Sequence, residues 1–96
     1  MAVIRTVRYT TDPNDATEMV AARGRVVTAT RESYPGLVAA RLSRIDEQTW
    51  SDAWHWESAE QMHAAVNAAA TIPGVGEAFA MISLVGVEVS ELVDEA

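Results

Sequence analysis

Three tryptophans and an aspartate stand close together in the segment "WSDAWHW", which begins at Trp50. If this segment is a β-strand, alternate side chains share a face, so the aspartate lies in one stripe with all three indoles. Burial among indoles would raise the pKa of such a carboxyl group toward neutrality and make it a better general base. The stripe is either a packed core that tolerates one charge or the wall of a pocket that uses it. Its members are Trp50, Asp52, Trp54 and Trp56.

In a pocket, each of these side chains would have a distinct role. The indoles of Trp54 and Trp56 would stack on a planar aromatic molecule, and the carboxylate of Asp52 would accept a proton from it. Arg5 belongs to a strand that we expect beside this one, which makes its guanidinium a candidate partner for the carboxylate. The alternative is a plain core in which Asp52 pairs with an arginine. No set of side chains with metal-ligand spacing accompanies the stripe, so we predict no metal site.

Length and composition predict one modest core. The chain has 96 residues, 49% of them hydrophobic, which predicts a single domain over residues 1–96 with an acidic tail from about residue 90. The absence of cysteine excludes disulfides and thiolate catalysis. No apolar run is long enough to span a membrane, and the first ten residues lack the pattern of a secretory signal. We therefore expect the protein in the cytoplasm.

Charge is distributed unevenly along the chain. Residues 1–45 contain all seven arginines against four acidic residues, a net charge of +3, whereas residues 46–96 contain ten acidic residues and no base, a net charge of −10. Folding should interleave the two halves, so no concentrated basic surface is expected. Nucleic acid and membranes are accordingly not expected as partners.

The order of predicted elements is β-α-β-β-α-β. Asp12 and Ser58 are typical N-caps, and each precedes a run with helical spacing. This order predicts an α+β, ferredoxin-like fold with an antiparallel sheet. The predicted strands are 2–10, 37–45, a tryptophan strand from residue 50 that ends in "WES" at 56–58, and 77–89, and the predicted helices are 13–33 and 59–71.

Two helices can cover only one face of such a sheet. We expect the tryptophan stripe on the other face, and the apolar strand at 77–89 to be buried on both of its faces. A sheet face with three indoles must be shielded from water, and a second copy of the chain is the simplest partner that could shield it. The residues thus predict a homodimer that encloses a space between its two sheets.

The segment "HWESAEQMHAA" at 55–65 ends a strand and begins a helix within this element order. In this respect the whole chain is similar to the antibiotic biosynthesis monooxygenase (ABM) family of dimeric α+β barrels. The resemblance implies an oxidoreductase that needs no cofactor and acts on a small planar phenolic, quinol-type or polyketide-like molecule. It also implies a homodimer with the pocket between sheet and helices. The sequence therefore does not decide which face of the sheet lines the pocket. If it is not the face with the tryptophans, Ser51 and His55 on the other face of the same strand would line it.

The resemblance also assigns roles to residues. Trp56 matches a tryptophan to which catalysis is attributed in the quinone-forming members, and Asp52 occupies the position of their asparagine. Met62 stands where those members carry a tyrosine, and it joins Trp50, Trp54 and Arg5 as an expected substrate-binding residue. A dimeric barrel that binds a small ligand without chemistry is the alternative. Haem binding or degradation is less favoured, because His63 lies three residues short of the position of the iron ligand in those members.

Overall fold

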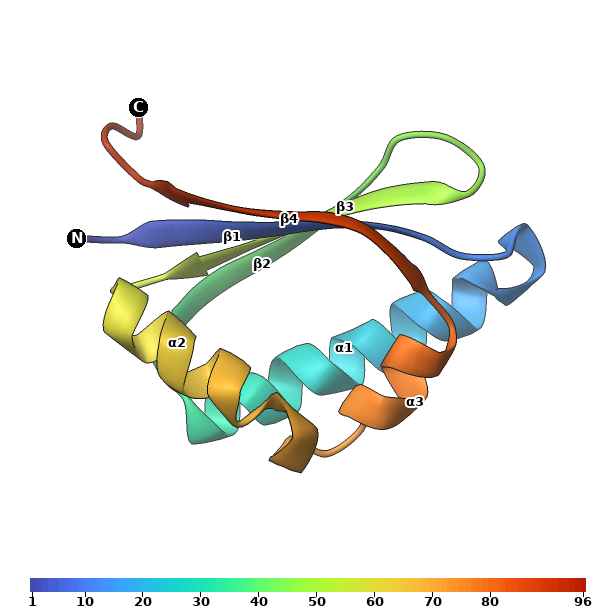
Figure 1. The fold of residues 1–96 in the computed structure, drawn as a ribbon, viewed down its shortest axis with the longest axis horizontal. Coiled ribbons are helices and arrows are strands. Elements are labelled where there is room, and N and C mark those ends of the chain that lie inside the picture. Colours follow the sequence, from blue (N-terminus) through green and yellow to red (C-terminus); the bar gives the residue numbers. More distant parts are fainter.

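Four strands form one antiparallel sheet, and all the helices lie on the same face of it (Figure 1). The computed structural model describes residues 1–96, and its strand order is β2-β3-β1-β4. The predicted ferredoxin-like α+β fold is confirmed, with one helix more than expected. The elements are β1 (Val3–Thr10), a 3-10 turn η1 (Pro13–Asp15), α1 (Ala16–Ser33), β2 (Leu37–Arg44), β3 (Thr49–Trp56), α2 (Ala59–Asn67), η2 (Ala69–Thr71), α3 (Val75–Ala80) and β4 (Ser83–Glu91).

Both predicted caps form. The side chain of Asp12 accepts a hydrogen bond of 2.9 Å from the backbone N–H of Asn14, at the start of the turn that leads into α1. The hydroxyl of Ser58 accepts one of 3.2 Å from the backbone N–H of Gln61. Such bonds satisfy N–H groups that have no partner within the first turn of a helix. Ser58 caps α2 directly, whereas Asp12 caps the turn η1, and α1 itself begins after Asp15, whose side chain makes no cap bond.

The tryptophan stripe faces the helices, so its predicted position on the opposite face is wrong. Trp56 is 2% exposed and packs with Met62 and Ala65 of α2, whereas Trp50 packs with Tyr9 and with Met19 of α1. The indoles are the largest apolar side chains in the chain, and burying them against the helices removes much apolar area from water in a domain with a small core. Trp50 and Trp56 are therefore buried within a single chain, and Trp54 is partly buried.

The helix-free face of the sheet is polar. Successive side chains of a strand project from opposite faces of the sheet, and residues paired in register project from the same face. Thr6 lies on the helix-free face and is paired with Ala53 of β3 and Glu88 of β4, which identifies the other side chains on this face. Most of them are small or hydrophilic, so this face does not require the apolar cover that we expected. They include Ile4, Thr6, Arg8, Ala39, Arg41, Ser43, Ser51, Ala53, His55, Glu88 and Ser90.

The last strand also differs from the prediction. It begins at Ser83, not at residue 77, because Val75–Ala80 form α3, and all nine of its residues are exposed. As an edge strand it has a neighbour on one side only, and the helix layer does not cover its side chains. Four apolar side chains are consequently about half exposed, namely Leu84, Val85, Val87 and Val89.

No helix is both long enough and apolar enough to cross a membrane.

Candidate functional site

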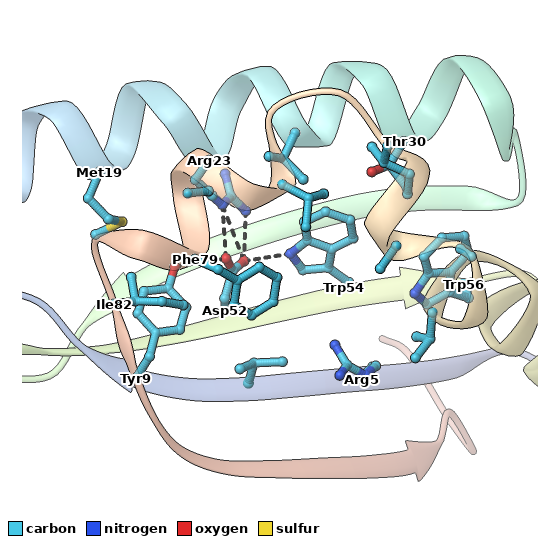
Figure 2. A pocket seen from close by; sticks show the side chains of 18 residues that line it. Arg5, Tyr9, Met19, Arg23, Thr30, Asp52, Trp54, Trp56, Phe79 and Ile82 are labelled. Carbon is cyan, nitrogen blue, oxygen red and sulfur yellow. Dashed lines mark hydrogen bonds and ion pairs between the residues drawn. The ribbon is translucent and has the colours of Figure 1, made fainter.

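A cavity of about 170 Å³ lies between the sheet and the helices (Figure 2). Fourteen of its 18 lining residues are hydrophobic, and they come from β1, β3, α1, α2, α3 and the segments beside α3. Its volume is similar to that of an engineered apolar cavity that holds benzene. The cavity therefore offers an aromatic ring a mostly apolar site with few polar groups, as small-molecule sites usually do.

At one end of the cavity, the carboxylate of Asp52 is surrounded by hydrogen-bond donors. Oδ2 accepts from the Tyr9 hydroxyl at 2.9 Å and from Arg23 Nε at 3.1 Å. Oδ1 accepts from Arg23 Nη2 at 2.9 Å, from Trp54 Nε1 at 2.8 Å and from Arg23 Nε, which it shares with Oδ2, at 3.3 Å. A carboxylate has about four lone-pair sites, so these five bonds, one of them shared between the two oxygens, occupy it fully. Asp52 is 5% exposed, and its charge is compensated by a two-pronged ion pair with Arg23.

Arg23 lies on the side of α1 that faces the sheet. Met19, Arg23, Val26 and Thr30 recur at the three- and four-residue intervals that place side chains on one face, and all four line the cavity. The arginine is the one charge on this apolar face. It reaches across the cavity to the one charge on the facing side of β3.

Tyr9 is affected strongly by this environment. Burial, and then the negative charge and hydrogen bond of Asp52, raise the pKa of the Tyr9 phenol well above its ordinary value. The phenol therefore stays protonated and donates to the carboxylate throughout the neutral range.

At the other end of the cavity, polar groups have no partner. Arg5 extends from β1, where it is paired in register with Trp54, and its guanidinium makes no hydrogen bond or ion pair. The dashed lines in Figure 2 converge on Asp52, and none reaches Arg5. Desolvation by burial lowers the pKa of the Arg5 guanidinium from its ordinary value. The indole N–H of Trp56, on β3, and the hydroxyl of Thr30, on α1, are buried beside the same cavity, and neither has a hydrogen-bond partner.

The two indoles of the wall lie close to each other. The ring centroids of Trp54 and Trp56 are 6.4 Å apart, and the ring planes differ by 30°. Their nitrogens differ in status, because Trp54 Nε1 donates to Asp52 whereas Trp56 Nε1 has no acceptor. The indole N–H of Trp56 is therefore an unpaired donor, and that of Trp54 is not.

Solved structures with the same fold are known, although no family model and no curated protein matches this chain. SnoaB, a cofactor-independent oxygenase from Streptomyces nogalater, is 15% identical, with a TM-score of 0.79 over 98% of this chain and 95% of that one. HapK from Hahella chejuensis is 18% identical, with a TM-score of 0.77 over 100% and 96%. A candidate antibiotic biosynthesis monooxygenase from Chloroflexus aurantiacus is 16% identical, with a TM-score of 0.70 over 100% and 97%. This chain has the ABM fold.

Within this ABM fold, the cavity brings together four of the six residues expected at the site. Arg5, Asp52, Trp54 and Trp56 line it, on the side of the sheet that faces the helices. The expected contact between Arg5 and Asp52 does not form, because Arg23 occupies the carboxylate instead. The remaining two residues lie in the core beside the cavity.

Trp50 and Met62 are those two residues. Trp50 packs against Tyr9 and Met19, and the guanidinium of Arg44 lies 5.0 Å from the centre of its ring. Met62 is 2% exposed and belongs to the core cluster around Trp56. Their contribution to the site is thus to support the residues that line it. The alternative lining residues, Ser51 and His55, project from the opposite face of β3.

The sequence analysis missed Arg23, Tyr9 and the wall formed by α3. Arg23 could have been found, because it is a charge at helical spacing between Met19 and Val26. The α3 wall also had a signal, since Val75, Ala78, Phe79 and Ile82 follow the spacing of one helix face and all line the cavity. Gly74, with φ of 88°, separates this helix from the preceding turn.

Proposed function

We propose that the protein is a cofactor-independent monooxygenase of the ABM type, acting on a small planar phenolic or quinol-type molecule. One observation carries this proposal: an apolar cavity beside Trp54 and Trp56, in which the indole N–H of Trp56 has no partner. The fold that the chain shares with SnoaB supports the reaction class. On the sequence alone, we keep the cytoplasm as the proposed location.

In such a reaction the substrate itself supplies the electrons. An acidic phenol or enol loses its proton to water before it binds, and the carbanion form of the resulting anion reduces dioxygen. When a CH₂ group between two rings is oxidised, one O₂ is consumed, one oxygen atom forms the new C=O, and the other leaves as water. The protein has to bind the ring, stabilise the ionised form and keep bulk water out. Trp54 and Trp56 bind the ring, and Trp56 Nε1 donates to an oxygen of the substrate.

The hydrogen bonds of Asp52 change the role that we propose for it. A general base needs a lone pair directed at the substrate, and here all four sites are occupied by Tyr9, Arg23 and Trp54. We therefore propose Asp52 as a positioning residue that holds the ring of Trp54 in place and keeps Arg23 in the wall. Trp56 remains the proposed catalytic residue.

Oxygen uptake with a panel of hydroquinones and anthrone-like phenols tests this function. We expect uptake by the wild type, and a decrease of about tenfold or more in Trp56→Phe, which keeps a ring but loses the N–H donor. Trp50→Phe is the matched control, because Trp50 is also buried with an unpaired N–H but lies outside the cavity wall. No uptake by the wild type, or equal loss in both variants, would contradict the proposal.

A barrel that binds a ligand without chemistry is the second candidate. The saturated carboxylate favours it, because no free base lies in the cavity. Quenching of tryptophan fluorescence by the same phenols, with no consumption of oxygen, would identify this function. No observation favours haem, since neither His55 nor His63 lines the cavity.

We also propose a homodimer in which the partner covers β4. The support is the row of about half-exposed apolar side chains on this edge strand, which a soluble monomer would leave in water. Val87 and Val89 pair with Val7 and Arg5 of the cavity wall, so a partner placed there would lie beside the cavity.

Light scattering after gel filtration tests the dimer. We expect a dimer for the wild type and a monomer for Val87→Lys. Val38→Lys is the control, because Val38 has a similar exposure of 50% on the other edge strand. A dimer that survives Val87→Lys would place the interface elsewhere.

A further inference from the structure

The charges of the cavity wall are not balanced. Three charged side chains line it, namely Arg5, Arg23 and Asp52. The last two neutralise each other in an ion pair of 2.9 Å, which leaves the guanidinium of Arg5 as a net positive charge. The whole chain has a net charge of −7, so this local excess is opposite in sign to the protein around it.

An unpaired guanidinium in apolar surroundings is unfavourable. Removing a charged group from water has a large cost unless hydrogen-bonded counter-charges replace the water. Arg5 is half-buried and has no acceptor in the chain, and desolvation lowers its pKa. The chain contains 14 acidic residues, yet none of them forms an ion pair with Arg5. The missing partner is therefore expected from outside the chain.

A second donor lies within reach of the same place. Arg5 is paired in register with Trp54, and Val3 with Trp56, so Arg5 and Trp56 are diagonal neighbours across β1 and β3. Long and aromatic side chains at such positions can reach a common point. Trp56 is 2% exposed, and its Nε1 is buried without an acceptor. Figure 2 shows both side chains in the same half of the cavity, away from Asp52.

We infer that this end of the cavity is an oxyanion site, in which Arg5 and the indole N–H of Trp56 bind an ionised oxygen of an aromatic ligand. Both groups are donors and neither can accept, so a neutral hydroxyl gains less from them than a phenolate or carboxylate does. The inference rests on the proposed function, because the ligand is the substrate of that same cavity. It narrows the substrate to molecules that are bound as anions, and it gives Arg5 the role of stabilising the ionised form.

The probe 4-nitrophenol tests the site, because it ionises near neutral pH and its phenolate is yellow. At fixed pH near that transition, we expect the wild type to increase the yellow fraction, since it binds the phenolate about tenfold or more tightly than the neutral phenol. In Arg5→Gln, phenolate binding should weaken by about ten- to a hundredfold, and binding of the neutral phenol should change by less than about twofold. Trp56→Phe should show a smaller loss in the same direction.

Arg8→Gln is the matched control. Arg8 lies on the same strand, but it is exposed and its side chain projects from the helix-free face, so its loss should leave the yellow fraction unchanged. Benzoate, which carries a carboxylate in place of the phenolate, distinguishes the two kinds of anion that the site could bind. Binding of the phenolate alone indicates a phenol-type substrate, and binding of benzoate alone indicates a carboxylic acid; either result supports an oxyanion site.

Three results would overturn the inference: no binding of either anion, a wild type that prefers the neutral phenol, or an Arg5→Gln variant that binds the phenolate as tightly as the wild type. A different result separates this inference from the oxygenase proposal. If the phenolate binds through Arg5 and no oxygen is consumed with any phenol, the oxyanion site stands and the oxygenase proposal fails.

Discussion

The two ends of the cavity differ in how their polar groups are satisfied. At the Asp52 end, one carboxylate accepts five hydrogen bonds from three side chains. At the Arg5 end, a guanidinium and an indole N–H have no acceptor. A closed network gains stability and has nothing left for a ligand, whereas unpaired donors reduce stability and are available for binding. We propose that the Asp52 end maintains the shape of the cavity and that the Arg5 end selects the ligand.

The largest expected effect on stability is at the Asp52 end of the cavity. Asp52→Ala leaves Arg23 without its counter-charge and leaves Tyr9 and Trp54 without their acceptor, so we expect a loss of about 3 kcal/mol in the free energy of unfolding. Urea denaturation followed by fluorescence measures it. Glu88→Ala, an exposed carboxylate without a partner, should change the free energy of unfolding by less than about 0.5 kcal/mol. Similar values for both variants would show that the network contributes no stability.

The phenol of Tyr9 gives an effect that depends on pH. Tyr9→Phe removes one hydrogen bond to a charged group, and we expect a loss of about 1–2 kcal/mol at neutral pH. Folding raises the pKa of this phenol, so its contribution is fully present below the unfolded pKa of about 10 and is lost as pH rises through the folded value. The difference between wild type and Tyr9→Phe should therefore shrink above about pH 10.

Tyr34 provides the control for that pH dependence. Its hydroxyl makes no hydrogen bond, so Tyr34→Phe should lose less stability than Tyr9→Phe and should keep the alkaline decline of the wild type. Stability curves for the three proteins at a series of pH values compare them directly. An unchanged alkaline decline in Tyr9→Phe would assign that decline to another group.

Two buried threonines sharpen the same contrast. The hydroxyl of Thr30 has no partner, so Thr30→Val should leave stability unchanged or raise it by up to about 1 kcal/mol. The hydroxyl of Thr11 donates to the carbonyl of Met81 at 2.6 Å, and Thr11→Val should lower stability by about 1 kcal/mol. Thermal unfolding of both variants tests the expected difference in sign. A clear loss in Thr30→Val would mean that its hydroxyl is satisfied in solution.

The smallest expected effect on stability is at the Arg5 end of the cavity. Arg5→Gln removes a half-buried charge that has no partner, and we expect the free energy of unfolding to stay within about 0.5 kcal/mol of the wild type or to rise. The same change should nevertheless weaken phenolate binding strongly. A large loss of stability in Arg5→Gln would show that this guanidinium has a structural partner, and the contrast between the two ends would then be wrong.

The element order could be predicted from local sequence signals. Caps at Asp12 and Ser58 and the alternation from Trp50 to Trp56 are properties of neighbouring residues, and both helix starts and the third strand follow them. The run from residue 77 to 89 misled the prediction, because the spacing of Val75, Ala78 and Phe79 is helical while their composition alone resembles a buried strand. Hydrophobicity without its period does not distinguish the two structures.

The candidate site was predicted in part for a similar reason. Alternation correctly placed Asp52 in one stripe with the tryptophans, since that depends only on the strand. Which face the helices cover is not a local property, and the helix-free face turned out to be the polar one. The partner of Asp52 was also missed, because Arg23 lies 29 residues earlier and reaches the carboxylate only when α1 packs on the sheet.

By itself, the sequence determined the elements, their order and the stripe in which one carboxylate lies among three indoles, because each of these follows from spacing along a single strand or helix. Only the tertiary structure decided what these side chains meet. It directed the stripe toward the helices, matched Asp52 with Tyr9, Arg23 and Trp54, and left Arg5 without a partner. The physical reason is that pairing and burial depend on contacts between segments far apart in the chain, which form only when the helix layer closes over the sheet.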